Sequence, residues 1–190
     1  MATATRKTSP STRKAPAASK KTGATAAGPD ATALLRADHK RVSALFDAYE
    51  GARSVAKKKA IVASICLELS VHAQVEEEIF YPAVKAALKD KEMVPEATVE
   101  HATLKELIAQ VKDKTPDGEM FDAKIKVMSE YVKHHVKEEQ NEMFPKAKKS
   151  RLDMNALGAQ IAARKDELMA SPELLEAPPV PASPAMAATA

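Results

Sequence analysis

The chain has 190 residues, 45% of them hydrophobic and 29% charged, and its net charge at pH 7 is +3. This composition fits one soluble domain with tails, and the single cysteine, Cys66, excludes an intramolecular disulfide. No apolar run approaches the roughly 18 residues that a membrane span needs, and the N-terminus lacks the apolar segment of a signal peptide. We therefore expect a cytoplasmic protein without a membrane contact.

Residues 1–29 form a predicted N-terminal tail. The tail carries six basic residues and no acidic one, which leaves a charge of −3 for the rest of the chain. Its other residues are mainly Ala, Thr, Ser, Pro and Gly, a composition that buries too little surface to fold, so we expect disorder. Such a tail can contact nucleic acid or another polyanion, or it can simply raise solubility. No aromatic residue lies among the basic ones, which favours the second role.

Helical periodicity dominates between Asp30 and Ala170, and no segment alternates as a strand does. The sequence therefore predicts an all-α protein, with a four-helix bundle at residues 30–150 and an additional helix at 151–170 that packs outside it. A second disordered tail, rich in Pro and Ala, is expected at 171–190. Asp30 and Ser54 suit helix N-caps, and Pro95 suits a first turn. The predicted helices span about 30–51, 54–82, 95–115, 117–145 and 153–169.

The four middle helices contain an internal repeat. His72 and Glu76 are four positions apart, and the same pair recurs 63 positions later as His135 and Glu139. Each pair is preceded by an acidic residue and a histidine, Asp38-His39 in the first half and Glu100-His101 in the second, 62 positions apart. Pro82 and Pro145 are again 63 positions apart. This period is too long for the common solenoid repeats and favours two duplicated helix pairs.

The repeated histidines and glutamates fall on the apolar faces of their helices. Leu35 and Val42 flank His39 at helical spacing, and Leu69 and Met128 lie on the faces that carry the two His-Glu pairs. A carboxylate on an inward face is costly unless it is paired or binds a metal. The sequence therefore predicts a metal site inside the bundle, made by His39, His72, Glu76, His101, His135 and Glu139.

Four imidazoles and two carboxylates suit two ions better than one, because each carboxylate can bridge and the histidines divide two per ion. This mixed set of nitrogen and oxygen ligands is typical of iron, manganese or zinc, and the cores of helical bundles commonly hold such sites. The motif resembles the hemerythrin-like HHE cation-binding family, over roughly Thr32 to Lys148. The resemblance implies an up-down-up-down bundle with two iron ions in a non-haem di-iron centre. In it, Glu76 and Glu139 would bridge the ions and the four histidines would be terminal ligands.

The resemblance also implies a function in binding or sensing oxygen, nitric oxide or peroxide, in iron homeostasis or in stress response. Oxygen-carrying hemerythrins use a fifth histidine on the third helix, whereas Ala97 and Lys105 occupy the positions four residues before and after His101. Simple reversible oxygen carriage is therefore not expected. A di-iron peroxidase or oxidase, and a metal-stabilised bundle that binds partners through its basic tail, are alternatives. Nothing in the sequence marks an organic substrate pocket, so an enzyme is the weaker expectation.

Three residues near the motifs leave open questions. His134 and Glu138 also form a His-x-x-x-Glu pair, but the position of Pro145 favours the register of His135, so we expect His134 to be solvated or beside the site. Glu142 follows His135 by seven positions and either completes the site or lies at its rim. Tyr81 is expected at the boundary of the core, too far along its helix to reach the site. Cys66 is expected to be a small core residue rather than a redox thiol.

Overall fold

The computed structural model describes Met1 and residues 28–176, and within these residues there are helices and turns but no strand. The predicted all-α fold is confirmed. The predicted tails at residues 2–27 and 177–190 lie outside the described part of the chain. The α-helices are α1 (Ala31–Gly51), α2 (Val55–Val75), α3 (Tyr81–Leu88), α4 (Met93–Val111), α5 (Gly118–Glu138), α6 (Phe144–Lys149) and α7 (Met154–Ala170).

The predicted helix starts are confirmed at three N-caps. The Asp30 side chain accepts a hydrogen bond from the Ala33 amide, and Ser54 accepts one from Lys57. The Asp153 side chain accepts hydrogen bonds from two amides in the first turn of α7. Each cap satisfies amides that the helix itself cannot bond.

The second and fourth predicted helices are longer than expected, and each contains a π-helical turn. η1 (Glu76–Phe80) joins α2 to α3, and η2 (Glu139–Met143) joins α5 to α6. Pro82 and Pro145 follow these turns, and a proline inside a helix lacks an amide donor and crowds the carbonyl four residues before it. The wider π turn opens the backbone at that point. The helices therefore continue to Leu88 and Lys149, and the prediction that they end near the prolines is wrong.

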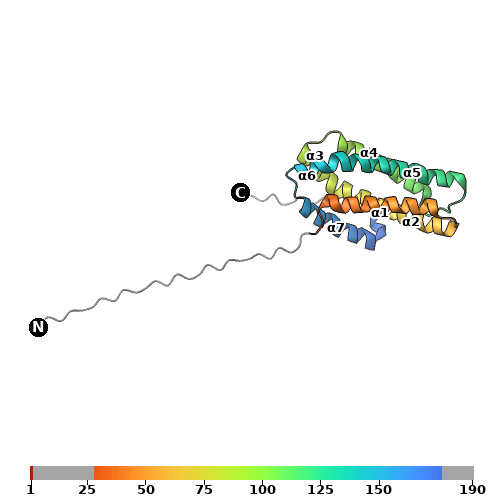
Figure 1. Ribbon diagram of the computed structural model, residues 1–190, viewed down its shortest axis with the longest axis horizontal. Helices are drawn as coiled ribbons and strands as arrows, with labels where there is room; N and C mark the ends of the chain where they lie inside the picture. Colours follow the sequence, from red (N-terminus) through yellow and green to blue (C-terminus); the bar gives the residue numbers. More distant parts are fainter. Residues whose placement is uncertain (2–27, 177–190) are drawn as a thin grey trace.

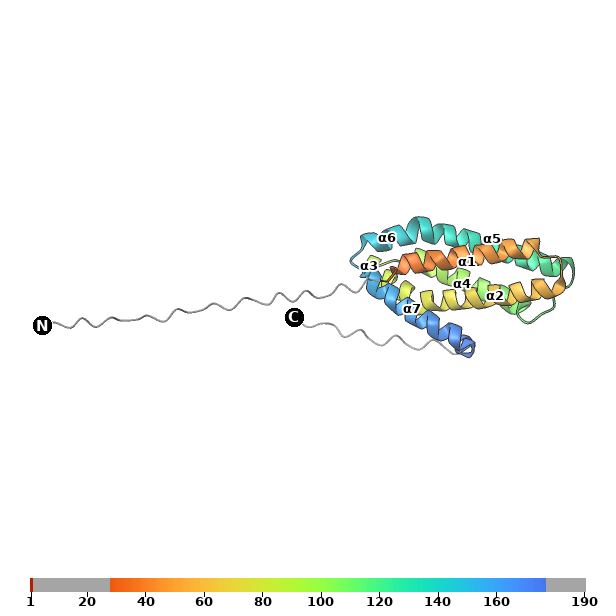
Figure 2. The same ribbon diagram turned by 60° about the horizontal axis from the view of Figure 1, so that its bottom comes forward.

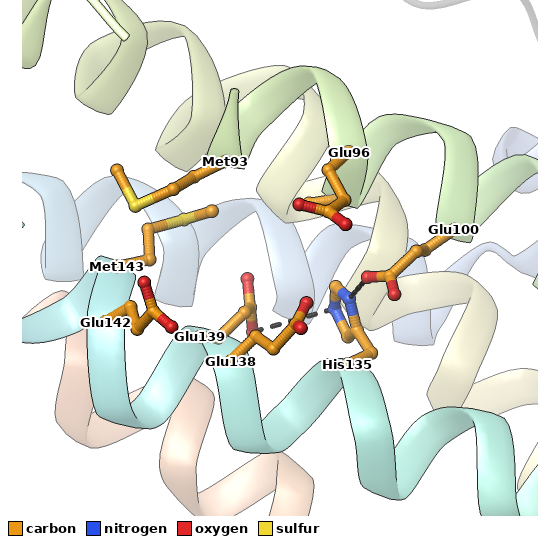
Figure 3. A pocket seen from close by; sticks show the side chains of 9 residues that line it. Met93, Glu96, Glu100, His135, Glu138, Glu139, Glu142 and Met143 are labelled. Carbon is orange, nitrogen blue, oxygen red and sulfur yellow. Dashed lines mark hydrogen bonds and ion pairs between the residues drawn. The ribbon is translucent and has the colours of Figure 1, made fainter. Parts of the chain in front are cut away.

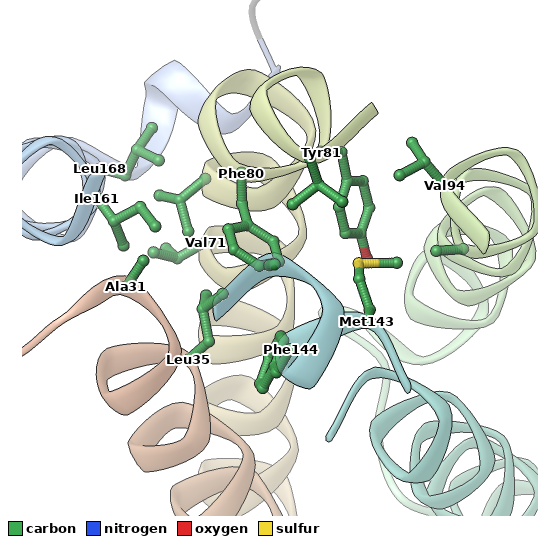
Figure 4. Close-up of a cluster of buried hydrophobic side chains, with 14 residues drawn as sticks. Ala31, Leu35, Val71, Phe80, Tyr81, Val94, Met143, Phe144, Ile161 and Leu168 are labelled. Carbon is green, nitrogen blue, oxygen red and sulfur yellow. The ribbon is translucent and has the colours of Figure 1, made fainter. Parts of the chain in front are cut away.

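The long helices run antiparallel to their neighbours, and the two π turns lie at the same end of the bundle (Figures 1 and 2). α1 packs against α2, and α4 packs against α5. α7 lies outside the bundle as predicted, along α1, α2 and η1. Its Ile161 and Leu168 are fully buried against Ala31 and Val71 in one apolar cluster with Phe80 (Figure 4).

The chain after α7 begins with structure that was not expected. Pro172–Glu176 form a short 3-10 helix, η3, that contacts α2 and α7. The prediction of disorder from residue 171 is therefore wrong for this segment, where leucines 174 and 175 pack against the apolar cluster around Ile161. None of the helices in the described residues combines the length and apolar character that a membrane span requires.

Candidate metal centre

The six predicted site residues lie together inside the bundle. The rings of His39 and His72 face each other, with their Nε2 atoms 3.0 Å apart. His101 and His135 repeat this arrangement in the second half of the chain, with 3.2 Å between their Nε2 atoms. All six residues are buried, and none exposes more than 6% of its surface. Four helical segments that are far apart in the sequence thus direct their nitrogen and oxygen atoms at one point.

Glu76 and Glu139 lie between the two histidine pairs. Glu76 Oε2 is 3.1 Å from His72 Nε2 and 3.5 Å from His101 Nε2. Glu139 Oε2 is 3.3 Å from His39 Nε2 and 3.7 Å from His135 Nε2. Each carboxylate therefore approaches one histidine from each half of the chain. This is the position that a carboxylate bridging two ions would take.

The potential ligand atoms form two overlapping groups, in each of which all atoms lie within 4.8 Å of one another. The first group contains His39, His72 and both glutamates, and the second contains His101, His135 and Glu76. Glu76 Oε1 and Glu139 Oε2 are buried and accept no hydrogen bond. Buried carboxylate oxygens without partners are costly. A metal cation at each group would remove that cost, so the residues fit a two-metal centre.

The charges of the site are strongly coupled. Burial by itself would raise the pKa of Glu139, but the close contact with His39 Nε2 and the positive charges of the nearby histidines lower it to about 2. Burial would lower the pKa of His72, but the charge of Glu76 and a contact with Asp38 raise it to about 10. Burial dominates at His39 and lowers its pKa. In the metal-free protein, a proton on His72 partly balances the carboxylates, and a bound cation would replace it.

Three of the four histidines have a hydrogen-bond partner at Nδ1, on the side away from the centre, and His72 has a nearby carboxylate there. His135 Nδ1 lies 2.7 Å from Glu100, and His101 Nδ1 lies 3.1 Å from Glu77. In the first half, Asp38 is 3.6 Å from His72 Nδ1, and the Gln140 amide is 2.9 Å from His39 Nδ1. Such partners fix the ring orientation of metal-binding histidines and direct Nε2 at the metal. The partners repeat like the ligands: Asp38 corresponds to Glu100, and Glu77 corresponds to Gln140.

Tyr81 lies in the centre, which contradicts the prediction that it stays at the boundary of the core. It is 2% exposed, and its hydroxyl is 3.0 Å from Glu139 Oε1, 3.3 Å from Glu76 Oε2 and 3.2 Å from His101 Nε2. Burial and the two neighbouring carboxylates raise the pKa of Tyr81 well above its ordinary value, so the phenol keeps its proton.

The π turn explains how Tyr81 reaches the site. In an uninterrupted α-helix, Tyr81 would lie about 180° around the axis from His72, but one additional residue in the turn reduces this offset to about 80°. The same turn buries Phe80 and leaves Ile79 only half-buried. The spacing of Pro82 from Glu76, repeated at Pro145 and Glu139, is the sequence signal for the turn.

The other residues considered from the sequence lie around the centre. His134 is exposed and within 3.2 Å of Glu138, as expected for a solvated residue. Glu142 is also exposed and pairs with Lys146 at the rim. Cys66 is buried in the core, as expected. Glu77 orients His101, whereas Glu78 pairs with Arg164 of α7.

The structure resembles that of a hemerythrin HHE cation binding domain-containing protein from Mycobacterium kansasii. The TM-score is 0.66 and the sequence identity is 21%, over 78% of this chain and 93% of that one, which shows a shared fold. The curated sequences include a DNA nickase from Nostoc sp. (strain PCC 7120) that is 27% identical over 111 residues. That match covers 58% of this chain, which spans only 31% of the nickase.

The comparison with family models agrees with the geometry. The model of the hemerythrin HHE cation binding domain matches residues 30–147, which contain all six predicted site residues. The match covers more than half of the chain and includes the two clusters of potential metal-binding atoms formed by the six predicted site residues. The chain is a metal-binding helical protein and belongs to the hemerythrin HHE cation-binding family.

Proposed function

We propose that the protein holds a non-haem di-iron centre that binds or senses oxygen, nitric oxide or peroxide, with a role in iron homeostasis or stress response. The observation that carries this proposal is the pair of histidine groups joined by Glu76 and Glu139. Nitrogen and oxygen ligands without a nearby thiolate favour iron, with manganese or zinc as the other metals that fit. Cys66 lies in a different core cluster from Phe80 and Phe144, which surround the site.

Different side chains would have different roles at this centre. When bound, the iron pair supplies Lewis acidity and redox chemistry. His39, His72, His101 and His135 would hold the ions through Nε2 while their Nδ1 partners fix the rings. Tyr81 would hold a proton at its hydroxyl next to both carboxylates. Phe144 stacks on His39 and excludes water from that side.

Six side chains cannot fill the coordination spheres of two six-coordinate ions, which leaves positions for a small ligand. The family's oxygen carriers use a fifth histidine, but Ala97 is a small buried residue, and Lys105 pairs with Glu77 at the surface. Neither of these two positions therefore supplies a further imidazole to the centre. We propose sensing or binding of a small ligand rather than reversible oxygen transport.

The test is anaerobic loading of metal-free protein with ferrous iron, followed by elemental analysis and absorption spectra before and after oxygen, nitric oxide or peroxide. We expect about two irons per chain and new near-ultraviolet bands after exposure to at least one of these ligands. His134 and His135 are adjacent, so His134→Ala is a matched control for His135→Ala. Only the second variant should lose iron and the bands. Wild-type protein that takes up no iron, or that shows no response to any ligand, would rule out this function.

A second candidate is turnover of peroxide, and the position of Tyr81 favours it. A buried phenol beside both carboxylates can deliver a proton to a ligand at the centre. Iron-loaded protein should then consume peroxide faster than free iron does. Tyr81→Phe should lower this rate while the iron content stays the same. An unchanged rate in that variant would exclude the role of Tyr81.

The role of the basic tail stays a prediction, as does a cytoplasmic location. If the tail binds nucleic acid, deletion of residues 1–27 should abolish a salt-dependent association of the full chain with DNA. The similarity to the nickase adds little here, because this chain spans less than a third of that protein. Unchanged affinity after deletion would remove this proposal.

A further inference from the structure

The internal repeat allows the two sides of the metal centre to be compared, and they differ in access. On the side of the second half, between α4 and α5, a cavity of about 60 Å³ connects the surface to the centre. Exposed Glu96 and Glu142 lie at its outer end, and buried His135 and Glu139 lie at its inner end (Figure 3). Glu138 lines the same cavity between them. We name Glu96, Glu138 and Glu142 the acidic opening.

The corresponding side of the first half is apolar. The internal repeat relates each residue of the acidic opening to an apolar residue in the first half. Leu34 corresponds to Glu96, Val75 to Glu138 and Ile79 to Glu142. All three pack in the cluster that contains Ile161 and Leu168 of α7. α7 contacts α1, α2 and η1 and thus covers this groove (Figure 4). The side between α1 and α2 is therefore covered by an apolar helix, whereas the side between α4 and α5 has a cavity lined by carboxylates together with Met93, Ala97 and Met143.

The helix that closes the first side lies outside the segment that matches the family, which ends at residue 147. Two basic residues of α7 also contact carboxylates that lie next to the predicted metal ligands. Lys165 forms an ion pair with Asp38, the partner of His72, and Arg164 binds Glu78. The equivalent of Asp38 in the second half is Glu100, and in place of a lysine it has the exposed His134 at 3.8 Å. Positive charge thus covers the closed side, while the open side remains acidic.

A buried carboxylate oxygen without a hydrogen bond lies behind the opening. Glu139 lines the cavity and is 1% exposed, and its Oε2, although 3.3 Å from His39 Nε2, accepts no hydrogen bond. The charge at the rim is only partly balanced: Lys146 lies 3.5 Å from Glu142, and the exposed His134 lies 3.2 Å from Glu138. Carboxylate oxygens are ligands that divalent cations accept readily. A cation at the rim therefore meets successive carboxylates on its way to Glu139.

We infer that the acidic opening is the route by which divalent cations are captured from solution and passed to the metal centre. The inference rests on the proposed metal centre and adds the side from which that centre is loaded. Its carboxylates attract a cation over several ångströms and raise its local concentration at a rim that leads to His135 and Glu139. Glu96, Glu138 and Glu142 would act on the rate of loading and would not be ligands of the final site.

The test compares the kinetics of metal uptake with the final state. Metal-free protein is mixed rapidly with Co²⁺ at low ionic strength, and the absorption of bound cobalt is followed with time. The triple variant E96Q/E138Q/E142Q removes the charge of the acidic opening without changing side-chain shape. The matched control E106Q/E119Q/E130Q removes three exposed carboxylates from the same two helices, α4 and α5, further from the centre.

In the triple variant, we expect the second-order rate constant for uptake to fall about 10-fold, and the difference should shrink as salt is added. The amount of bound cobalt and its final spectrum should equal those of the wild type. The control should load within about twofold of the wild-type rate. Loading of the triple variant at the control rate would overturn the inference. Reduced cobalt content with an unchanged rate would also overturn it, because the carboxylates would then be ligands. Wild-type protein that takes up no cobalt would contradict the metal centre itself.

Discussion

Tyr81 donates a hydrogen bond to Glu139, which lies 58 positions later in the chain and in the opposite half of the repeat, at 3.0 Å. The same hydroxyl is within 3.3 Å of Glu76 Oε2. A single phenol thus contacts both carboxylates of the centre. The second half of the chain has Phe144 at the corresponding position, which stacks on His39 and offers no hydroxyl. The two halves of the duplicated site are therefore not equivalent.

Replacing Tyr81 with Phe removes this contact without changing the shape of the ring. In metal-free protein, the buried carboxylates then lose a donor, and we expect the free energy of unfolding to fall by about 1–3 kcal/mol. Tyr49→Phe is the control, because the Tyr49 hydroxyl binds Asp122, which is half exposed and keeps its ion pair with Lys58. That variant should lose less, about 0.5–1.5 kcal/mol. Denaturant unfolding measures the free energy of unfolding of both variants. An equal loss would show that the hydroxyl of Tyr81 stabilises the protein no more than that of Tyr49.

The sequence was sufficient to predict the bundle and the grouping of the six site residues. Periodicity identified the inward faces of all the long helices, and the repeat distinguished His135 from His134. Tyr81 was missed because a straight helix places it on the wrong face, and the π turn is a local departure that propensities do not reveal. The role of Asp38 was missed for another reason: Asp38 precedes His39 in the sequence but lies beside His72 on the next helix. That pairing depends on how the helices pack.

Glu76 and Glu78 lie in the same π turn but have different partners, which makes them a matched pair for a test of metal stoichiometry. Glu76 belongs to both groups of potential ligands, whereas Glu78 binds Arg164. We expect Glu76→Gln to lower the metal content from about two ions per chain to about one or fewer, because the bridge is lost. Glu78→Gln should keep both ions. Elemental analysis after loading and desalting gives the result, and full occupancy in Glu76→Gln would remove its bridging role.

Asp38 is expected to tune the affinity of the first half. It lies between His72 and Lys165, and although burial raises its pKa, the contacts with His72 and Lys165 lower it overall, so it remains a carboxylate. Asp38→Asn removes the charge that orients His72, and such partners typically change metal affinity by about 10- to 100-fold. Asp47→Asn, an exposed change on the same helix, should leave the affinity unchanged. Competition with a chelator measures the affinity, and equal values for the two variants would contradict the role of Asp38.

Cys66 should behave as an inert core residue. Burial raises its pKa from 9.0 to about 11, so at pH 8 the thiol is protonated and reacts slowly with a disulfide reagent. Unfolding in denaturant should restore the normal rate. Because the pKa is higher in the folded state, this group stabilises the fold fully below pH 9 and loses that contribution as the pH rises towards 11. Rapid labelling of native protein at pH 8 would show that the thiol is accessible.

Gly158 tests how closely α7 must approach α1 to close the first side of the centre. A Cβ atom at this position would lie 2.5 Å from the Pro29 carbonyl oxygen and 2.9 Å from the Ala31 amide nitrogen. In an unobstructed helix, Gly→Ala stabilises by about 0.5–1 kcal/mol. Here the clash is with backbone atoms that cannot rotate away, so α7 must shift from the start of α1. We expect Gly158→Ala to destabilise the protein by about 1–3 kcal/mol.

Gly51→Ala provides the matched control for Gly158→Ala, because Gly51 is also helical and a Cβ atom there meets nothing within 4 Å. The control should be neutral or slightly stabilising. Thermal unfolding of the two metal-free variants measures the difference, and their effects should have opposite signs. If Gly158→Ala stabilised the protein as much as Gly51→Ala, α7 would tolerate a looser contact. The close approach of α7 to α1 would then not be required to keep the first side closed.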